Sequence, residues 1–208
     1  MPRFKPRRFD VEPLIEAVID REGRYVNHPA DRGGPTCWGI TEAVARAKGY
    51  SGPMRDLPRE TAAAIYRGVY WLAPGFDRVA LRTPLVAAEL FDIAVHMGTA
   101  VAAGFLQRTL NALNRGARDY PDIIVDHRIG PRSLSALDGF LHIRGAPGES
   151  VLLRAVEALK GERYIALAER RPSQEAFPFG WLASRLGIAC RLGFAPPRQV
   201  SKIQGSQP

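Results

Sequence analysis

Cysteine and long apolar runs are both scarce in this sequence of 208 residues. The two cysteines, Cys37 and Cys190, form no CxxC pair, so no zinc site is indicated and we expect neither a metal nor another cofactor. No stretch approaches about 18 consecutive apolar residues, the length that a membrane-spanning helix needs. We therefore expect no stable insertion into a membrane.

The sequence also lacks the pattern of a cleavable secretory signal. The first ten residues, MPRFKPRRFD, are basic, but no apolar segment follows them. The following residues include four acids: Glu12, Glu16, Asp20 and Glu22. We expect synthesis in the cytoplasm without a signal peptide, so a target outside the cytoplasm requires another route of delivery. In that compartment the two thiols are expected to be free rather than bridged.

The sequence has fewer acidic residues than basic ones. The chain has 29 Lys and Arg against 21 Asp and Glu, a net charge of +8, and its 46% hydrophobic residues are typical of a globular protein. Such a charge favours a polyanionic partner: nucleic acid, an anionic membrane surface or an anionic cell wall. The arginines are dispersed and no nucleic-acid-binding motif is present, so we expect no nucleic acid partner.

Helical periodicity dominates, and clear strands are few. We expect a mainly α protein. The predicted helices are 11–22, 41–49, 58–71, 84–98, 99–114, 131–144, 147–171 and a last segment from Ser173 that contains Trp181. Asp10, Thr41 and Thr99 are the expected N-terminal caps of the helices that they begin or precede, and Gly161 is a point where the helix 147–171 can be interrupted. The turn-forming residues between Tyr25 and Ile40 predict a small β-hairpin after the first helix. Residues 195–208 are expected to form a loose tail.

Glu22 occupies an unusual place on the first predicted helix. With 100° of rotation per residue, it falls inside the apolar stripe formed by Leu14, Ile15, Val18 and Ile19. It is also the last residue before Gly23. Burial and the negative end of the helix dipole both favour a protonated carboxyl group, which a general acid requires. The alternative is a frayed helix end with Glu22 in water.

A second carboxylate follows nine residues later, at Asp31 within the turn-forming segment. A pair of carboxylates is typical of glycoside hydrolysis. The alternative is that Asp31 only forms an Asx turn before Gly33 and Gly34.

These residues belong to a longer set of ordered motifs. Together they resemble glycoside hydrolase family 108 from Leu14 to Trp181. The segments that carry the resemblance are EGRYVNHPADRGGPTCWGIT, AIYRGVYW, ELFDIAVHMG, FLQRTLNALN, VDHRIGPRSLSAL and ERYIALAERRPSQEAFPFGW.

The resemblance implies a lysozyme-like fold and an N-acetylmuramidase of the phage or prophage endolysin kind. Such an enzyme hydrolyses the β-1,4 bond between N-acetylmuramic acid and N-acetylglucosamine and lyses bacterial cells. Residues 10–98 would be the catalytic segment and 99–184 a helical peptidoglycan-binding segment. We expect peptidoglycan as the partner, a monomer, and delivery to the wall by holin-type release or from a virion.

The same resemblance implies roles for individual residues. Glu22 corresponds to the catalytic glutamate. Asp31 would activate water or stabilise the oxocarbenium ion, and Thr36 or Thr41 would position that water. Candidates for sugar binding are Tyr25, Asn27, Trp38, Thr41, Asp92 and His96. Inversion or retention of the anomeric centre stays open.

Four residues depart from the usual family pattern: Arg24, His96, His127 and Ser133 stand where the family has Gly, Asn, Gly and Thr. If the position of Arg24 requires a positive φ, its side chain strains the turn after Glu22. Two other functions therefore stay open: a lytic transglycosylase, and a non-catalytic wall-binding or secretion-accessory protein.

Overall fold

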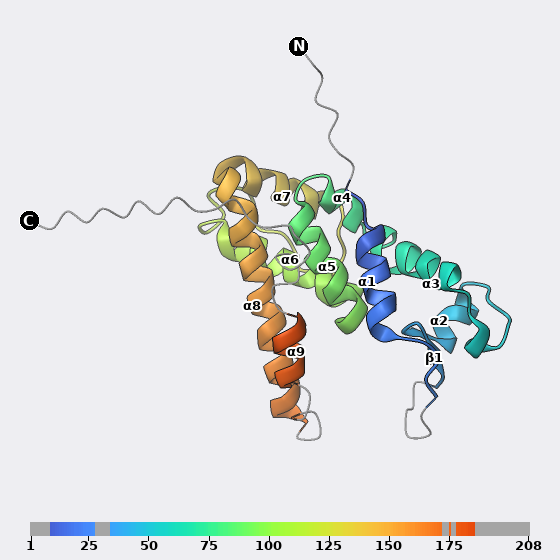
Figure 1. The fold of residues 1–208 in the computed structure, drawn as a ribbon. Helices are drawn as coiled ribbons and strands as arrows, with labels where there is room; N and C mark the ends of the chain where they lie inside the picture. The colour runs from blue at the N-terminus through green and yellow to red at the C-terminus, as the bar shows by residue number, and fades with distance from the viewer. Residues whose placement is uncertain (1–8, 28–33, 172–174, 176–177, 186–208) are drawn as a thin grey trace, which may run out of the picture.

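The computed structural model describes residues 9–27, 34–171, 175 and 178–185, and its elements are almost all helical (Figure 1). The α-helices are α1 (Glu12–Glu22), α2 (Glu42–Ala47), α3 (Arg59–Ile65), α4 (Phe76–Ala80), α5 (Pro84–Met97), α6 (Thr99–Leu113), α7 (Pro131–Arg144), α8 (Ala146–Arg170) and α9 (Pro178–Arg185). A 3-10 helix, η1 (Met54–Asp56), precedes α3, and a π-helical segment, η2 (Tyr66–Leu72), continues it. The prediction of a mainly α, lysozyme-like fold is confirmed.

The predicted hairpin is formed by strands β1 (Thr36–Cys37) and β2 (Ile40–Thr41), which are antiparallel. Cys37 pairs with Ile40, so the loop has two residues, Trp38 and Gly39. Both have a positive φ, 55° and 74°, as a type I′ turn requires. Such a turn favours Asn or Gly, so a tryptophan at its first position is unusual and carries backbone strain.

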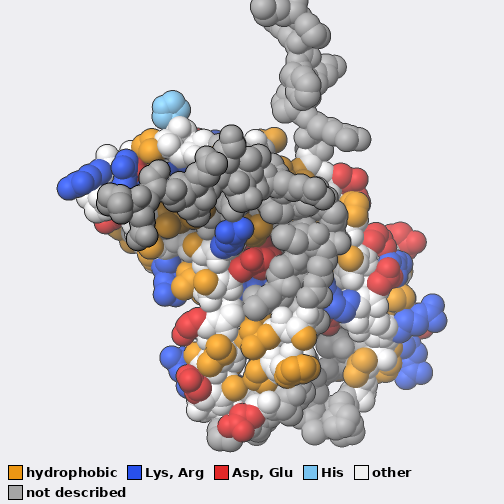
Figure 2. All heavy atoms as spheres, turned by 60° about the vertical axis from the view of Figure 1, so that its left-hand side comes forward, with side chains coloured by type: hydrophobic (Ala, Val, Ile, Leu, Met, Phe, Trp, Pro, Cys, Tyr) orange, Lys and Arg blue, Asp and Glu red, His pale blue; other side chains and the backbone are white. Residues whose placement is uncertain are grey.

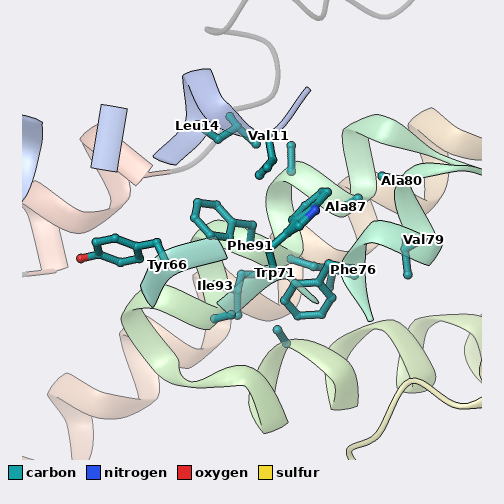
Figure 3. Close-up of a cluster of buried hydrophobic side chains, with 14 of the residues drawn as sticks. Val11, Leu14, Tyr66, Trp71, Phe76, Val79, Ala80, Ala87, Phe91 and Ile93 are labelled. Atoms are coloured by element: carbon teal, nitrogen blue, oxygen red, sulfur yellow. The ribbon is translucent and has the colours of Figure 1, made fainter. Parts of the chain in front are cut away.

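Helix α5 is the centre of the core. Every residue from Leu85 to Ala94 is buried, and the helix packs against α4, α6 and α8. In Figure 1 it lies between α1 and α8. The close-up in Figure 3 shows Phe91 of α5 and Trp71 of η2 below Leu14 of α1 and Val11, the residue before α1. The rings of Trp71 and Phe91 are 6.1 Å apart at 80°. A helix that is buried on all sides and mainly apolar is stable only in such surroundings.

The predicted ends of the helices near the hairpin are largely correct. The N-H of Gly23 donates to the carbonyl of Ile19 and ends α1, and the Thr41 hydroxyl accepts from the N-H of Val44 and caps α2. Asp10 accepts from the N-H of Glu12, although the cap residue of α1 is Val11.

The prediction of Thr99 as a cap is wrong. Gly98, with a φ of 94°, ends α5 and also precedes α6, and Thr99 is the first residue of α6. The prediction missed α4, a short helix that begins after Gly75. Helix α7 has the predicted bounds, and Gly161 does not interrupt α8.

Some predictions fall on other parts of the chain. Ser173, Cys190 and the tail 195–208 lie outside the described residues. Cys37 is a free, buried cysteine. None of the described helices combines the length and the apolar character that a membrane span needs. Figure 2 shows Lys and Arg side chains interspersed with acidic ones on the visible face, rather than gathered in one patch.

The loop between α6 and α7 is organised by polar side chains of α6. The Gln107 side chain donates to Asp126 and to the carbonyl of Arg128, and accepts from the N-H of His127. Asn111 exchanges two hydrogen bonds with the backbone of Ile123. Since buried polar groups need such partners, the two amides stabilise this irregular segment of the chain.

Candidate active site

Glu22 is the last residue of α1, and its stem packs against the hairpin turn. A Cβ atom added to Gly39 would lie 2.8 Å from Cγ and 2.9 Å from Cβ of Glu22, so only a glycine leaves room for this side chain. The residue is partly buried, and its Oε1 atom is buried. The predicted apolar stripe of α1 is confirmed, since Leu14, Ile15, Val18 and Ile19 are all buried.

Tyr66 packs against the same hairpin turn as Glu22. Its hydroxyl donates to the carbonyl oxygen of Trp38 at 3.0 Å and would lie 2.6 Å from a Cβ on Gly39. Burial and the neighbouring charge of Glu22 raise the pKa of this phenol far above its ordinary value, so the hydroxyl keeps its proton. In Figure 3 the ring of Tyr66 points away from Trp71 and Phe76, and its hydroxyl oxygen is the part farthest from them. Tyr66 therefore holds the turn against Glu22.

Thr36 is brought back toward Glu22 by backbone pairing. Val26, four residues after Glu22, exchanges two hydrogen bonds with Thr36, of 2.9 and 2.8 Å. Asn27 follows Val26 and is exposed. The Thr41 hydroxyl is used as the cap of α2. Asp31, the predicted second acid, lies outside the described residues.

Trp38 stands at the tip of the same turn, partly exposed. Its indole N-H donates to the carbonyl of Leu57 at 2.9 Å, which fixes the ring. The guanidinium groups of Arg24 and Arg59 lie over the ring, 5.6 and 5.5 Å from its centroid. Tyr25, also partly exposed, carries Arg55 over its ring at 5.7 Å. An aromatic face with a fixed orientation is suited to contact with a sugar or a planar group.

The strain predicted for Arg24 is absent. Gly23 adopts a φ of 72°, whereas Arg24 is not among the described non-glycine residues with positive φ. His127 behaves in the opposite way: it adopts a φ of 62°, which explains why a glycine is usual at its position. Ser133 is buried and bonded to Gln107 and Arg128, as a threonine hydroxyl can be. The geometry after Glu22 is therefore intact.

Asp92 and His96, two of the candidates for sugar binding, lie together within a network of charged side chains. Asp92 is 3% exposed and lies 3.4 Å from Nε2 of His96. Its Oδ2 atom accepts from Lys160 of α8 at 2.7 Å, and its Oδ1 atom lies 3.5 Å from Arg21. Lys160 also bonds Glu89 at 2.7 Å. Asp92 thus supports Arg21 and His96 and does not present its carboxylate to solvent.

Comparison with known proteins identifies both halves of the chain. The family profile described as glycosyl hydrolase 108 matches residues 15–98, the segment that contains Glu22, the hairpin and α5. Residues 15–98 belong to glycosyl hydrolase family 108. The profile described as a predicted peptidoglycan domain matches residues 101–186. The family 108 segment is therefore followed by a peptidoglycan-binding segment, and the chain is a glycoside hydrolase that acts on peptidoglycan.

A solved structure is similar over nearly the whole chain. The structure of SagA from Brucella abortus matches with a TM-score of 0.58 and 25% sequence identity, and the match covers 91% of this chain and 97% of that one. No curated protein matches the chain. The two chains thus share one fold over nearly their whole lengths.

Three features of the structure were not predicted from the sequence. Tyr66 is 1% exposed, and its bond to the hairpin turn was not predicted. Gly39 carried a signal, since it directly follows the bulky Trp38 between two short strands. The buried pair of Glu89 and Lys160 was missed as well; Glu89 was detectable as an acid within the apolar sequence of α5, three residues before Asp92.

Proposed function

We propose that this family 108 protein is an N-acetylmuramidase and that Glu22 is its general acid. The observation that carries the proposal is the position of Glu22 at the end of α1, wedged against Gly39 and Tyr66 beside strand β1. A carboxylate held in one position by packing can be aligned with a substrate at no further entropic cost. The match of residues 101–186 to a peptidoglycan domain supports peptidoglycan as the substrate.

In this proposal Glu22 donates its proton to the oxygen of the β-1,4 bond between N-acetylmuramic acid and N-acetylglucosamine. The bond from the anomeric carbon of N-acetylmuramic acid to that oxygen breaks, and the departing sugar leaves with a new hydroxyl group. Water adds to the anomeric carbon and loses a proton, which gives a new reducing end. Asp31 is the proposed acceptor of that proton, and Thr36 the residue that orients the water.

Glu22→Gln tests the proposal. Release of reducing ends from purified peptidoglycan should fall by at least about 100-fold, because the amide cannot donate the proton that leaving-group departure needs. Glu12→Gln, the same substitution in the first turn of the same helix, is the control and should retain activity. Glu22→Gln with activity close to that of the wild type would remove Glu22 from this role.

A lytic transglycosylase is the second candidate. It needs one carboxyl group, and the buried Asp92, which pairs with Arg21 near the end of α1, is also bound by Lys160 and close to His96. Such an enzyme forms 1,6-anhydro ends because the 6-hydroxyl of the muramic acid replaces water. Asp31→Asn separates the two: full activity with anhydro products favours the transglycosylase, and loss of activity favours the hydrolase.

The biological role that fits this activity is lysis of bacterial cells by a monomeric endolysin that reaches the wall through a holin-type lesion or from a virion. Added from outside, the protein should clear bacteria whose outer barrier has been permeabilised. Binding to isolated sacculi without any soluble product would instead indicate a non-catalytic wall-binding protein.

A further inference from the structure

A pocket of about 870 Å³ lies beside the hairpin turn, on the side of Trp38 and η1. Two aromatic residues, Tyr25 and Trp38, are part of its lining. Three arginines from separate segments, Arg24, Arg55 and Arg59, line it as well. Each of these arginines lies over one of the two rings, between 5.5 and 5.7 Å from its centroid.

The three arginines differ in their partners. Arg59 is bound to Glu16 and Asp20 of α1, so its charge is already used within the protein. Arg24 and Arg55 have no carboxylate partner among the residues that the structure describes, and both are exposed. Stacking on a ring orients each guanidinium, and a planar guanidinium binds a carboxylate through two parallel hydrogen bonds.

The pocket and Glu22 share the same turn of the chain. Trp38 forms a wall of the pocket through its ring, while the next residue, Gly39, contacts the stem of Glu22. A ligand in the pocket therefore lies next to a glycan strand at Glu22. In peptidoglycan, the muramic acid at the cleaved bond carries a short peptide with free carboxylates on its lactyl group.

We propose that Arg24 and Arg55 bind the carboxylates of this stem peptide and make the enzyme selective for peptide-bearing strands. This inference rests on the proposed function. Asp56 and Glu60 also line the pocket, so it carries both signs of charge. A peptide with carboxylates and an amino group matches such a lining, whereas the phosphates of a polyphosphate would be repelled by its two acids.

The test compares two substrates: intact peptidoglycan, and glycan strands from which an amidase has removed the stem peptides. The wild type should release new ends from the intact material at least about fivefold faster. In the double variant Arg24→Gln, Arg55→Gln, the ratio of the rates on the two substrates should fall to about one. Lys48→Gln, at an exposed lysine that follows α2, controls for the loss of positive charge and should keep the preference.

Equal rates of the wild type on both substrates would overturn the inference, as would an equal loss on both substrates in the double variant. A binding measurement separates this inference from the proposed function. Calorimetric titration with a free stem tetrapeptide should show binding to the wild type and at least about fivefold weaker binding to the double variant. If the protein cleaves neither substrate but binds the tetrapeptide through both arginines, the proposed muramidase activity is refuted and the proposed peptide-binding role of the pocket is retained. Binding that is equal in both proteins would refute the pocket.

Discussion

Replacement of Gly39 by alanine should displace Glu22 without unfolding the protein. At a φ of 74°, a side chain costs roughly 1–2 kcal/mol. The new Cβ would also lie 2.8 Å from Cγ of Glu22 and 2.6 Å from the Tyr66 hydroxyl. Tyr66 is held in the core, so the stem of Glu22, at the end of its helix, is the side that yields. Ordinary van der Waals contact requires a shift of about half an ångström, and misplacement by about 1 Å costs on the order of 100-fold in rate.

Gly34→Ala is the matched control. Gly34 has the same φ of 74°, but a Cβ added there meets no atom of the described residues within 4 Å. Both variants should lose about 1–2 kcal/mol from backbone strain, and Gly39→Ala about 1–3 kcal/mol more from the close contacts, as measured by urea unfolding. Only Gly39→Ala should lose activity toward peptidoglycan, by about 10- to 100-fold at a temperature where both are folded. Equal activities of the two variants would show that contact between Gly39 and Glu22 does not position the acid.

Two further predictions concern charge and packing in the rest of the fold. Burial raises the pKa of Glu89 from 4.5 to about 7 and outweighs the opposing charge of Lys160. Between these pH values the native state keeps a proton that the unfolded chain has lost, so the free energy of unfolding contributed by Glu89 falls as the pH rises, by up to roughly 3 kcal/mol. Glu89→Gln should remove this slope in urea unfolding between pH 4.5 and 7, and an unchanged slope would contradict the assignment. Separately, Gly104→Ala should cost about 1–3 kcal/mol, because its Cβ would lie 2.5 Å from Nδ1 of His127. Adding His127→Gly to this variant should restore most of the lost stability in thermal unfolding. If stability does not recover, the contact with His127 is not the cause of the loss.

Helix phase and turn chemistry explain why much of the site was predictable. The stripe of α1 is set by the spacing of its apolar residues, and Glu22 falls in it by simple rotation. The hairpin follows from a cluster of turn formers between two periodic segments. Gly23 ends α1 because its φ of 72° is open to glycine.

Contacts between distant segments explain what was not predictable. The Tyr66 hydroxyl reaches Trp38, 28 residues away, and Lys160 reaches Asp92, 68 residues away. Nothing in the local pattern around either residue specifies such a partner. The concern over Arg24 arose because a glycine is usual at its position. The structure shows instead that Gly23 alone takes the positive φ in that pair of residues.

The central claim is that Glu22 donates the proton that releases the sugar from a muramic acid residue. Mass spectrometry of the soluble fragments of purified peptidoglycan, treated with the wild type and with Glu22→Gln side by side, tests it most directly. The account predicts fragments that end in hydrated, reducing N-acetylmuramic acid with the wild type, and no such fragments above the untreated background with Glu22→Gln. Anhydro ends, ends on N-acetylglucosamine, or the same fragments from a folded Glu22→Gln variant would contradict it.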